Sequence, residues 1–232
     1  MKPIIGIVGR VEKNWRDTKT VQCHEGVRKN VLHNGGVPIT ILPTQDIYYE
    51  DKAPHTLPRL TIEEKEDLKR IIDLCDGIII PGTCVLYEFD EFIYEYALSK
   101  DIPILGICGG MQQMVICDNK KVEEKPLEKI ESIINHFQFD VDYVHKVSII
   151  PNTILSSIIK ESEITVNSRH NYKARGVNDL VVSGISEDGI IEAVEMPGKK
   201  FVLGVQWHPE NMCEYDKFSN KIFESFLNKC KK

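Results

Sequence analysis

Long apolar segments are absent from the sequence. No stretch approaches the roughly 20 consecutive apolar residues that a helix needs to cross a membrane. The apolar run at residues 4–8 is too short for the core of a signal peptide and is typical of a first β-strand. These absences argue against a membrane protein and against an exported one. We therefore expect a cytoplasmic protein with no membrane partner.

Paired cysteines and an excess of basic residues are absent as well. The seven cysteines are an odd number and contain no CxxC pair, so we expect neither disulfides nor a structural zinc site. Lysine and arginine number 29 against 35 aspartate and glutamate, which gives a formal net charge of −6 at pH 7. Non-specific nucleic-acid binding depends on clustered basic residues, so we expect no nucleic-acid partner.

The composition that remains is that of an ordinary globular chain. Hydrophobic residues make up 42% and charged residues 28% of the 232 positions, and neither disorder nor a fibrous class is indicated. A chain of this length buries a sizeable core and commonly forms one α/β unit. No internal repeat or low-complexity linker divides it. We expect a single domain over residues 1–232.

Short apolar runs alternate with amphipathic stretches in the first half of the chain. The runs are rich in β-branched residues and occupy residues 4–8, 37–42, 77–80 and 102–105. Apolar residues follow helical spacing at residues 22–33, 62–74 and 91–99. This alternation is typical of βαβ units, and strands that are apolar on both faces belong in a parallel sheet covered by helices on each side. We therefore predict a doubly wound α/β core.

The second half contains more closely spaced strand candidates. They lie at residues 143–150, 164–167, 180–183, 190–195 and 201–205. Their spacing predicts antiparallel hairpins added to the sheet. An amphipathic stretch at about residues 215–228 predicts a final helix.

Cys108 stands between glycines where a predicted strand gives way to a helix. The segment reads Gly106-Ile-Cys-Gly-Gly-Met111. This is the arrangement of a nucleophile elbow, in which a sharp turn lifts the side chain above the sheet. A helix N-terminus beside the thiol favours the thiolate, and the free N–H of Gly109 would face a developing oxyanion. Taken alone, the segment is equally compatible with a buried structural cysteine in a tight turn.

A histidine and a carboxylate follow the apolar run that begins at Phe201. His208 comes at the end of this predicted strand, and Glu210 follows two residues later across a proline. The proline discourages a helix, so both side chains can converge at the strand exit. A cysteine nucleophile needs a histidine base within reach, and that base needs a partner that fixes its tautomer. We therefore predict a triad of Cys108, His208 and Glu210.

These two segments resemble the signatures of class I glutamine amidotransferases. Within that superfamily the chain is most similar to the peptidase C26 branch, the γ-glutamyl-γ-aminobutyrate hydrolase-like proteins. The Ile-Ile-Gly-Ile strand near the N-terminus, the Asn-Gly-Gly-Val-Pro segment at residues 34–38 and the Val-Asn-Ser-Arg-His segment at residues 166–170 support this branch. The resemblance implies a flavodoxin-like, three-layer α/β fold with a mostly parallel sheet and added antiparallel strands.

The resemblance also implies a reaction and further site residues. The reaction is cysteine-dependent hydrolysis of a γ-glutamyl amide through a glutamyl thioester, without a cofactor. The oxyanion hole implied by the resemblance consists of Gly109, Thr83 and Gly82. The implied substrate-binding residues are Gln112, Ser168, Arg169 and His170.

Two functional interpretations stay open at this stage. One is a stand-alone hydrolase of a small γ-glutamyl amine or peptide, which the lack of a synthetase domain after residue 210 favours. The other is a glutaminase subunit that delivers ammonia to a separate synthetase partner. A homodimer is possible in either case. Arg10 could meet a substrate carboxylate or simply be solvated. The spacing of His136, His145 and His170 does not match a metal-ligand pattern, so we predict no metal.

Overall fold

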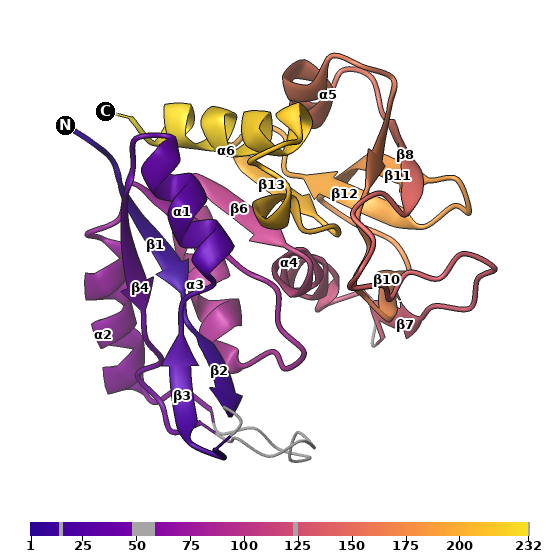
Figure 1. Ribbon diagram of the computed structural model, residues 1–232. Helices are drawn as coiled ribbons and strands as arrows, with labels where there is room; N and C mark the ends of the chain where they lie inside the picture. Colours follow the sequence, from indigo (N-terminus) through magenta and orange to yellow (C-terminus); the bar gives the residue numbers. More distant parts are fainter. Residues whose placement is uncertain (14–15, 48–58, 123–124, 232) are drawn as a thin grey trace.

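The computed structural model describes residues 1–13, 16–47, 59–122 and 125–231. Within these ranges a nine-stranded mixed sheet forms the centre of the molecule (Figure 1). In spatial order its strands are β4 (Val37–Ile41), β1 (Ile4–Val8), β5 (Gly77–Ile80), β6 (Ile104–Ile107), β13 (Val202–Val205), β12 (Ile191–Glu195), β11 (Val181–Ser186), β8 (His145–Ile149) and β9 (Glu163–Val166).

The strands from β4 to β13 run parallel to one another, and those from β12 to β9 run antiparallel to their neighbours. The predicted α/β fold with a large parallel part is confirmed. The prediction that residues 201–205 belong to the antiparallel set is wrong in one respect, since β13 pairs in parallel with β6 on its other side. Close spacing in the sequence revealed its hairpin with β12 but carried no information about its second, distant neighbour.

Helices cover both faces of the sheet and make three layers. One face carries α1 (Glu25–His33), α5 (Ile154–Ile159) and α6 (Lys217–Cys230), and the other carries α2 (Ile62–Ile72), α3 (Glu88–Ser99) and α4 (Gly109–Asn119). Side chains of a strand alternate between the faces, so Ile79 packs with the first group while Ile78 and Ile80 pack with the second. Burial on both faces is why β5, β6 and β13 are apolar throughout.

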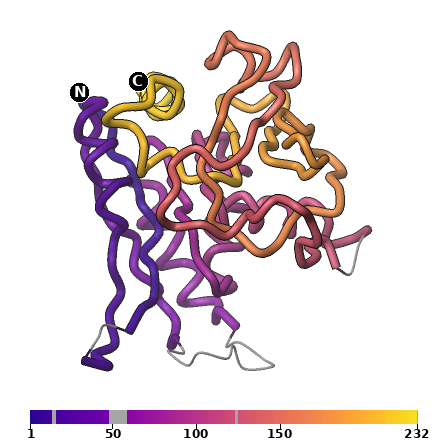
Figure 2. The backbone as a smooth tube through the Cα atoms, turned by 45° about the vertical axis from the view of Figure 1, so that its right-hand side comes forward, coloured from indigo at the N-terminus to yellow at the C-terminus, as the bar shows by residue number. Residues whose placement is uncertain are grey.

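Smaller elements surround this core. A hairpin of β2 (Arg10–Lys13) and β3 (Lys19–Gln22) extends from the end of β1, and β7 (Leu127–Lys129) pairs with β10 (Tyr172–Ala174). The sequence analysis did not predict these short strands or α5, because they are too short to show a period. The two ends of the chain lie near each other at one edge of the molecule (Figures 1 and 2). No helix among the described residues is long and apolar enough to cross a membrane.

The predicted elements agree with the observed ones in type and differ at their ends. The helix predicted at residues 91–99 begins earlier, at Glu88, because the Asp90 carboxylate accepts the N–H of Tyr87 and so caps the first turn. The strand predicted at residues 102–105 begins at Ile104 and continues to Ile107. This second shift places Cys108 directly after the strand.

Candidate active site

Cys108 occupies a sharp turn between β6 and α4. Its backbone has φ 51° and ψ −106°, a strained conformation for a residue with a side chain. Gly110, two residues after the cysteine, leaves no room for a side chain, because a Cβ atom there would lie 1.9 Å from the carbonyl oxygen of Ile80. The helix therefore starts tightly against the end of β5. The geometry is that of the predicted nucleophile elbow.

His208 lies next to this turn and is paired with Glu210. Its Nδ1 is 2.7 Å from Oε1 of Glu210, which sits in the short 3₁₀ turn η1 (Pro209–Asn211). Both Cys108 and His208 border Gly82, since a Cβ atom there would lie 3.4 Å from Cβ of Cys108 and 2.9 Å from Cε1 of His208. The structure thus brings together the three residues that the sequence predicted as a triad.

The electrostatics of the three groups are coupled. Burial raises the pKa of the Cys108 thiol, but the charge of His208 and its contact with the sulfur outweigh burial and lower the pKa below its usual value. Burial lowers the pKa of His208, yet Glu210 and Cys108 hold that pKa well above its usual value. For Glu210, burial raises the pKa and His208 more than offsets it, so the pKa is lowered. The arrangement favours a thiolate beside an imidazolium.

The loop that contains the predicted oxyanion residues Gly82 and Thr83 packs against the start of α4. A Cβ atom on Gly109 would lie 2.8 Å from the backbone nitrogen of Thr83, so the two predicted main-chain donors stand in one corner beside the cysteine. The Arg10 guanidinium donates to the carbonyl of Pro81 and is paired with Asp90. Arg10 is therefore buried, and its guanidinium is used by Asp90 and Pro81 instead of by solvent or a substrate. Its hydrogen bond to the Pro81 carbonyl connects this loop to the start of β2.

Two of the predicted substrate-binding residues have side chains that meet at one carbonyl. Nε2 of Gln112 donates to the carbonyl oxygen of Tyr172 at 3.1 Å, and Nδ1 of His170 lies 3.1 Å from the same oxygen. Nε2 of Gln112 also lies 3.3 Å from the side-chain oxygen of Gln206, a buried residue that directly follows β13. The sequence analysis did not identify Gln206 as part of this network.

The side chains of the other two predicted substrate-binding residues have partners elsewhere in the protein. Oγ of Ser168 is 3.0 Å from Nδ1 of His136, and both residues are buried. The guanidinium of Arg169 lies over the ring of Phe139, 5.7 Å from its centroid, and donates to the carbonyl of that residue. The role of the backbone around these two residues in substrate binding stays a prediction.

Main-chain anchors of the base and its partner were missed by the sequence analysis. The side chain of Asn167 accepts the N–H of His208 at 2.8 Å and donates to its carbonyl at 2.9 Å. Asn30 on α1 donates to the carbonyl of Glu210 at 3.1 Å. Asn167 is fully buried at the end of a strand, and a polar residue in such a position is the one sequence signal that could have suggested an anchor.

The chain is similar to known proteins along its whole length. The Peptidase C26 family model matches residues 87–210. The γ-glutamyl-γ-aminobutyrate hydrolase of Escherichia coli (strain K12) is 31% identical over 258 residues, which cover 98% of this chain and 93% of the relative. A CTP synthase of Rickettsia rickettsii (strain Sheila Smith) is 29% identical over 217 residues, which cover 77% of this chain but 38% of the relative. The glutaminase domain of Trypanosoma brucei CTPS shares the fold, with a TM-score of 0.65 and 18% identity over 99% of this chain and 94% of that one.

Proposed function

The chain belongs to the peptidase C26 family of glutamine amidotransferase-like hydrolases, and from this premise we propose that it cleaves the γ-glutamyl amide bond of a small γ-glutamyl amine or peptide. The observation that carries the proposal is the contact of Cys108 with a histidine whose other nitrogen is held 2.7 Å from a buried carboxylate. A γ-glutamyl substrate is supported by similarity to γ-glutamyl-γ-aminobutyrate hydrolase over nearly the whole of both chains.

In the proposed mechanism the Cys108 thiolate attacks the side-chain carbonyl carbon of the γ-glutamyl group. The carbonyl oxygen becomes an oxyanion and accepts hydrogen bonds from the N–H groups of Gly109 and Thr83. The His208 imidazolium donates its Nε2 proton to the departing nitrogen, and the amine leaves as the thioester forms. His208 then takes a proton from water, the hydroxide attacks the thioester, and free glutamate is released with the thiolate restored.

The first experiment measures glutamate release from glutamine and from a panel of γ-glutamyl amines and γ-glutamyl peptides. We expect one γ-glutamyl amine or peptide to be cleaved far faster than glutamine. Cys108→Ala should abolish turnover while the circular dichroism spectrum is unchanged, and Cys84→Ala, at an exposed thiol, is the matched control. Retained turnover in Cys108→Ala would remove this cysteine from the mechanism.

A second candidate function is supported by the similarity to CTP synthase. That relative is much longer than the matched region, and the match covers 38% of it. A glutaminase subunit working with a separate synthetase would hydrolyse glutamine slowly alone and would be activated by its partner. Slow release of glutamate from glutamine alone, with none from the rest of the panel, would favour this candidate.

A further inference from the structure

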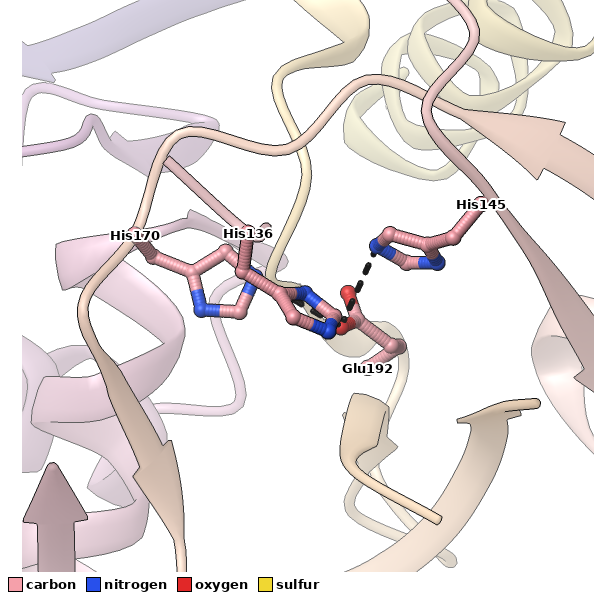
Figure 3. A group of neighbouring side chains, drawn as sticks. All are labelled: His136, His145, His170 and Glu192. Atoms are coloured by element: carbon pink, nitrogen blue, oxygen red, sulfur yellow. Dashed lines mark ion pairs between the residues drawn. The ribbon is translucent and has the colours of Figure 1, made fainter. Parts of the chain in front are cut away.

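Three histidines and a glutamate form a buried cluster beside the active site. They are His136, His145, His170 and Glu192, and they come from four separate segments of the chain. All four are buried, and one nitrogen or oxygen of each lies within 4.8 Å of those of the others. Figure 3 shows the three imidazole rings arranged around the Glu192 carboxylate.

The outer nitrogen of each ring faces an oxygen that only accepts hydrogen bonds. The acceptors are the Asp188 carboxylate for Nε2 of His136 at 3.0 Å, the Lys146 carbonyl for Nδ1 of His145 at 3.3 Å and the Tyr172 carbonyl for Nδ1 of His170 at 3.1 Å. An acceptor requires a proton on the nitrogen that faces it. In the neutral rings the inner nitrogens therefore carry lone pairs. Histidines that bind metals are oriented in the same way, by an acceptor on the nitrogen away from the ion.

The three inner nitrogens point at a carboxylate, and that of His136 also faces the Ser168 hydroxyl, which can donate to it, at 3.0 Å. They lie 3.6, 3.6 and 3.5 Å from Oε1 of Glu192, for His136, His145 and His170 respectively. Among the described residues, neither Nε2 of His145, Nε2 of His170 nor either oxygen of Glu192 has a hydrogen-bond partner. In neutral rings, lone pairs that face a carboxylate repel it, and unpartnered polar atoms are costly in a buried site. A cation between them removes both difficulties. Burial lowers the pKa of His170, but Glu192 raises it above its usual value, so a proton on that ring is the alternative to a cation.

We propose that this cluster binds one divalent transition ion of the zinc type through three nitrogens and one oxygen. Zinc bonds to imidazole nitrogen and carboxylate oxygen are about 2.0–2.1 Å long, which separates the ligands of a tetrahedral ion by about 3.4 Å. The observed separations of 3.5–3.6 Å from Glu192 to each ring nitrogen match this spacing. Imidazole-rich sites favour zinc and its neighbours over magnesium or calcium.

The surroundings of the cluster fit an ion with this charge. Asp188, which accepts from His136, supplies a second carboxylate, so the two carboxylates together balance a divalent ion. Ser168 lies 3.0 Å from Nδ1 of His136, and its hydroxyl can rotate to give up that contact when the nitrogen binds a metal. A surface pocket of about 230 Å³ has His136 and His170 in its lining, and an entry path for the ion would start there.

The inference departs from the expectation of no metal that sequence spacing gave. His136 belongs to the segment between β7 and β8, while the other ligands lie at the start of β8, between β9 and β10, and on β12. An ion held by all four would fasten that segment to the antiparallel part of the sheet. The role is structural and independent of the proposed cysteine chemistry, although His170 adjoins both sites.

The test is zinc binding by the full-length chain in a Cys108→Ala background, which prevents Cys108 and His208 from holding zinc. Metal is removed with a chelator, and Zn²⁺ is titrated back with calorimetry and with elemental analysis after desalting. We expect one zinc per chain and a higher unfolding temperature with zinc than without. Glu192→Gln and His145→Gln should each weaken zinc binding at least about tenfold. His33→Gln, at an exposed histidine, is the matched control and should bind as the parent does.

Each outcome decides the proposal. One zinc per chain that is lost in Glu192→Gln but kept in His33→Gln supports it. No stoichiometric zinc, or binding that Glu192→Gln leaves unchanged, overturns it and assigns the cluster to protonated histidines paired with the glutamate. Should the ligand variants fail to fold, the effect of Zn²⁺ on the unfolding temperature of the Cys108→Ala chain decides the matter, because the absence of any rise overturns the proposal. Failure of the γ-glutamyl assay leaves this result unaffected.

Discussion

The substitution Glu210→Gln tests the link between the carboxylate and the base. Oε1 of Glu210 lies 2.7 Å from Nδ1 of His208 inside the protein, so the carboxylate stabilises the imidazolium through a charge-assisted hydrogen bond. Such a bond contributes about 1.5–3 kcal/mol where a neutral one contributes about 1 kcal/mol. The difference of about 0.5–2 kcal/mol corresponds to roughly one pKa unit of His208, at 1.36 kcal/mol per unit. We expect kcat to fall about 2- to 30-fold, because each 1.36 kcal/mol is a factor of ten in rate.

The same substitution has a readout that does not depend on the substrate. In the parent, the Cys108 thiolate persists below the usual thiol pKa of about 8.5, because the imidazolium stabilises it. In Glu210→Gln the pKa of His208 falls, so less imidazolium is present to stabilise the Cys108 thiolate. The pH midpoint of Cys108 alkylation by iodoacetamide should therefore move upward by about one unit. Peptide mapping assigns the alkylation to Cys108 and separates it from that of the other cysteines.

Two comparisons make the result interpretable. Glu214→Gln, at an exposed glutamate nearby in the chain, should leave both kcat and the alkylation midpoint unchanged. His208→Ala should lower kcat more than Glu210→Gln does, because the base contributes more than the residue that orients it. Equal kcat and an equal midpoint in Glu210→Gln and the parent would refute the triad role of Glu210.

Two further substitutions test how the site is held. Asn167→Ala removes both side-chain hydrogen bonds to the main chain of His208, so we expect unfolding in urea to show a loss of about 2–4 kcal/mol, together with a lower kcat. An unchanged urea midpoint would show that this anchor is dispensable. Gly110→Ala places a Cβ 1.9 Å from the Ile80 carbonyl and should cost about 3 kcal/mol or more, whereas Gly176→Ala, with open space around it, should stay within about 0.5 kcal/mol. Equal stabilities of the two variants would contradict the close approach.

The parallel core was predictable because its signal is local. Fully buried strands such as Ile4–Val8 and Gly77–Ile80 are short apolar runs, and the amphipathic helix at Ile62–Ile72 starts at a capping threonine. The two-stranded pairs were not predictable, because three or four residues show no period. The parallel partner of β13 was not predictable either, since pairing with β6 joins segments about a hundred residues apart.

The triad and the buried cluster differ in what the sequence reveals. Cys108 and His208 each stand at the end of an apolar strand beside glycine or proline, so each has a local signature. The cluster has none, because the four segments that contribute to it carry ordinary single histidines and a glutamate on a buried strand. Glu192 was the available hint, as a carboxylate inside a run of otherwise apolar residues, and such a group needs a partner.

The meeting of Cys108 and His208 depends on the register of two strands. Ile107 of β6 pairs with Val205 of β13, and the two strands run in the same direction. Residues that follow paired positions in parallel strands leave the sheet at the same edge. Cys108 comes one residue after Ile107 and His208 three residues after Val205, so the two side chains lie at the same edge. The N–H of Cys108 donates to the Val205 carbonyl at 2.8 Å and carries this register into the elbow itself.

A pair of glycines in that register explains how the helix reaches the cysteine. Gly106 and Gly204 are partners across β6 and β13, and a Cβ atom on either would lie within 3.0 Å of Sδ of Met114 on α4. Without side chains at these two positions, α4 settles directly on the sheet. Its N-terminus then lies directly at Cys108, and the N-terminal end of a helix favours a negative charge such as a thiolate. The elbow therefore depends on β6, β13 and α4. The sequence motif around Cys108 contains the end of β6 and the start of α4 but not β13.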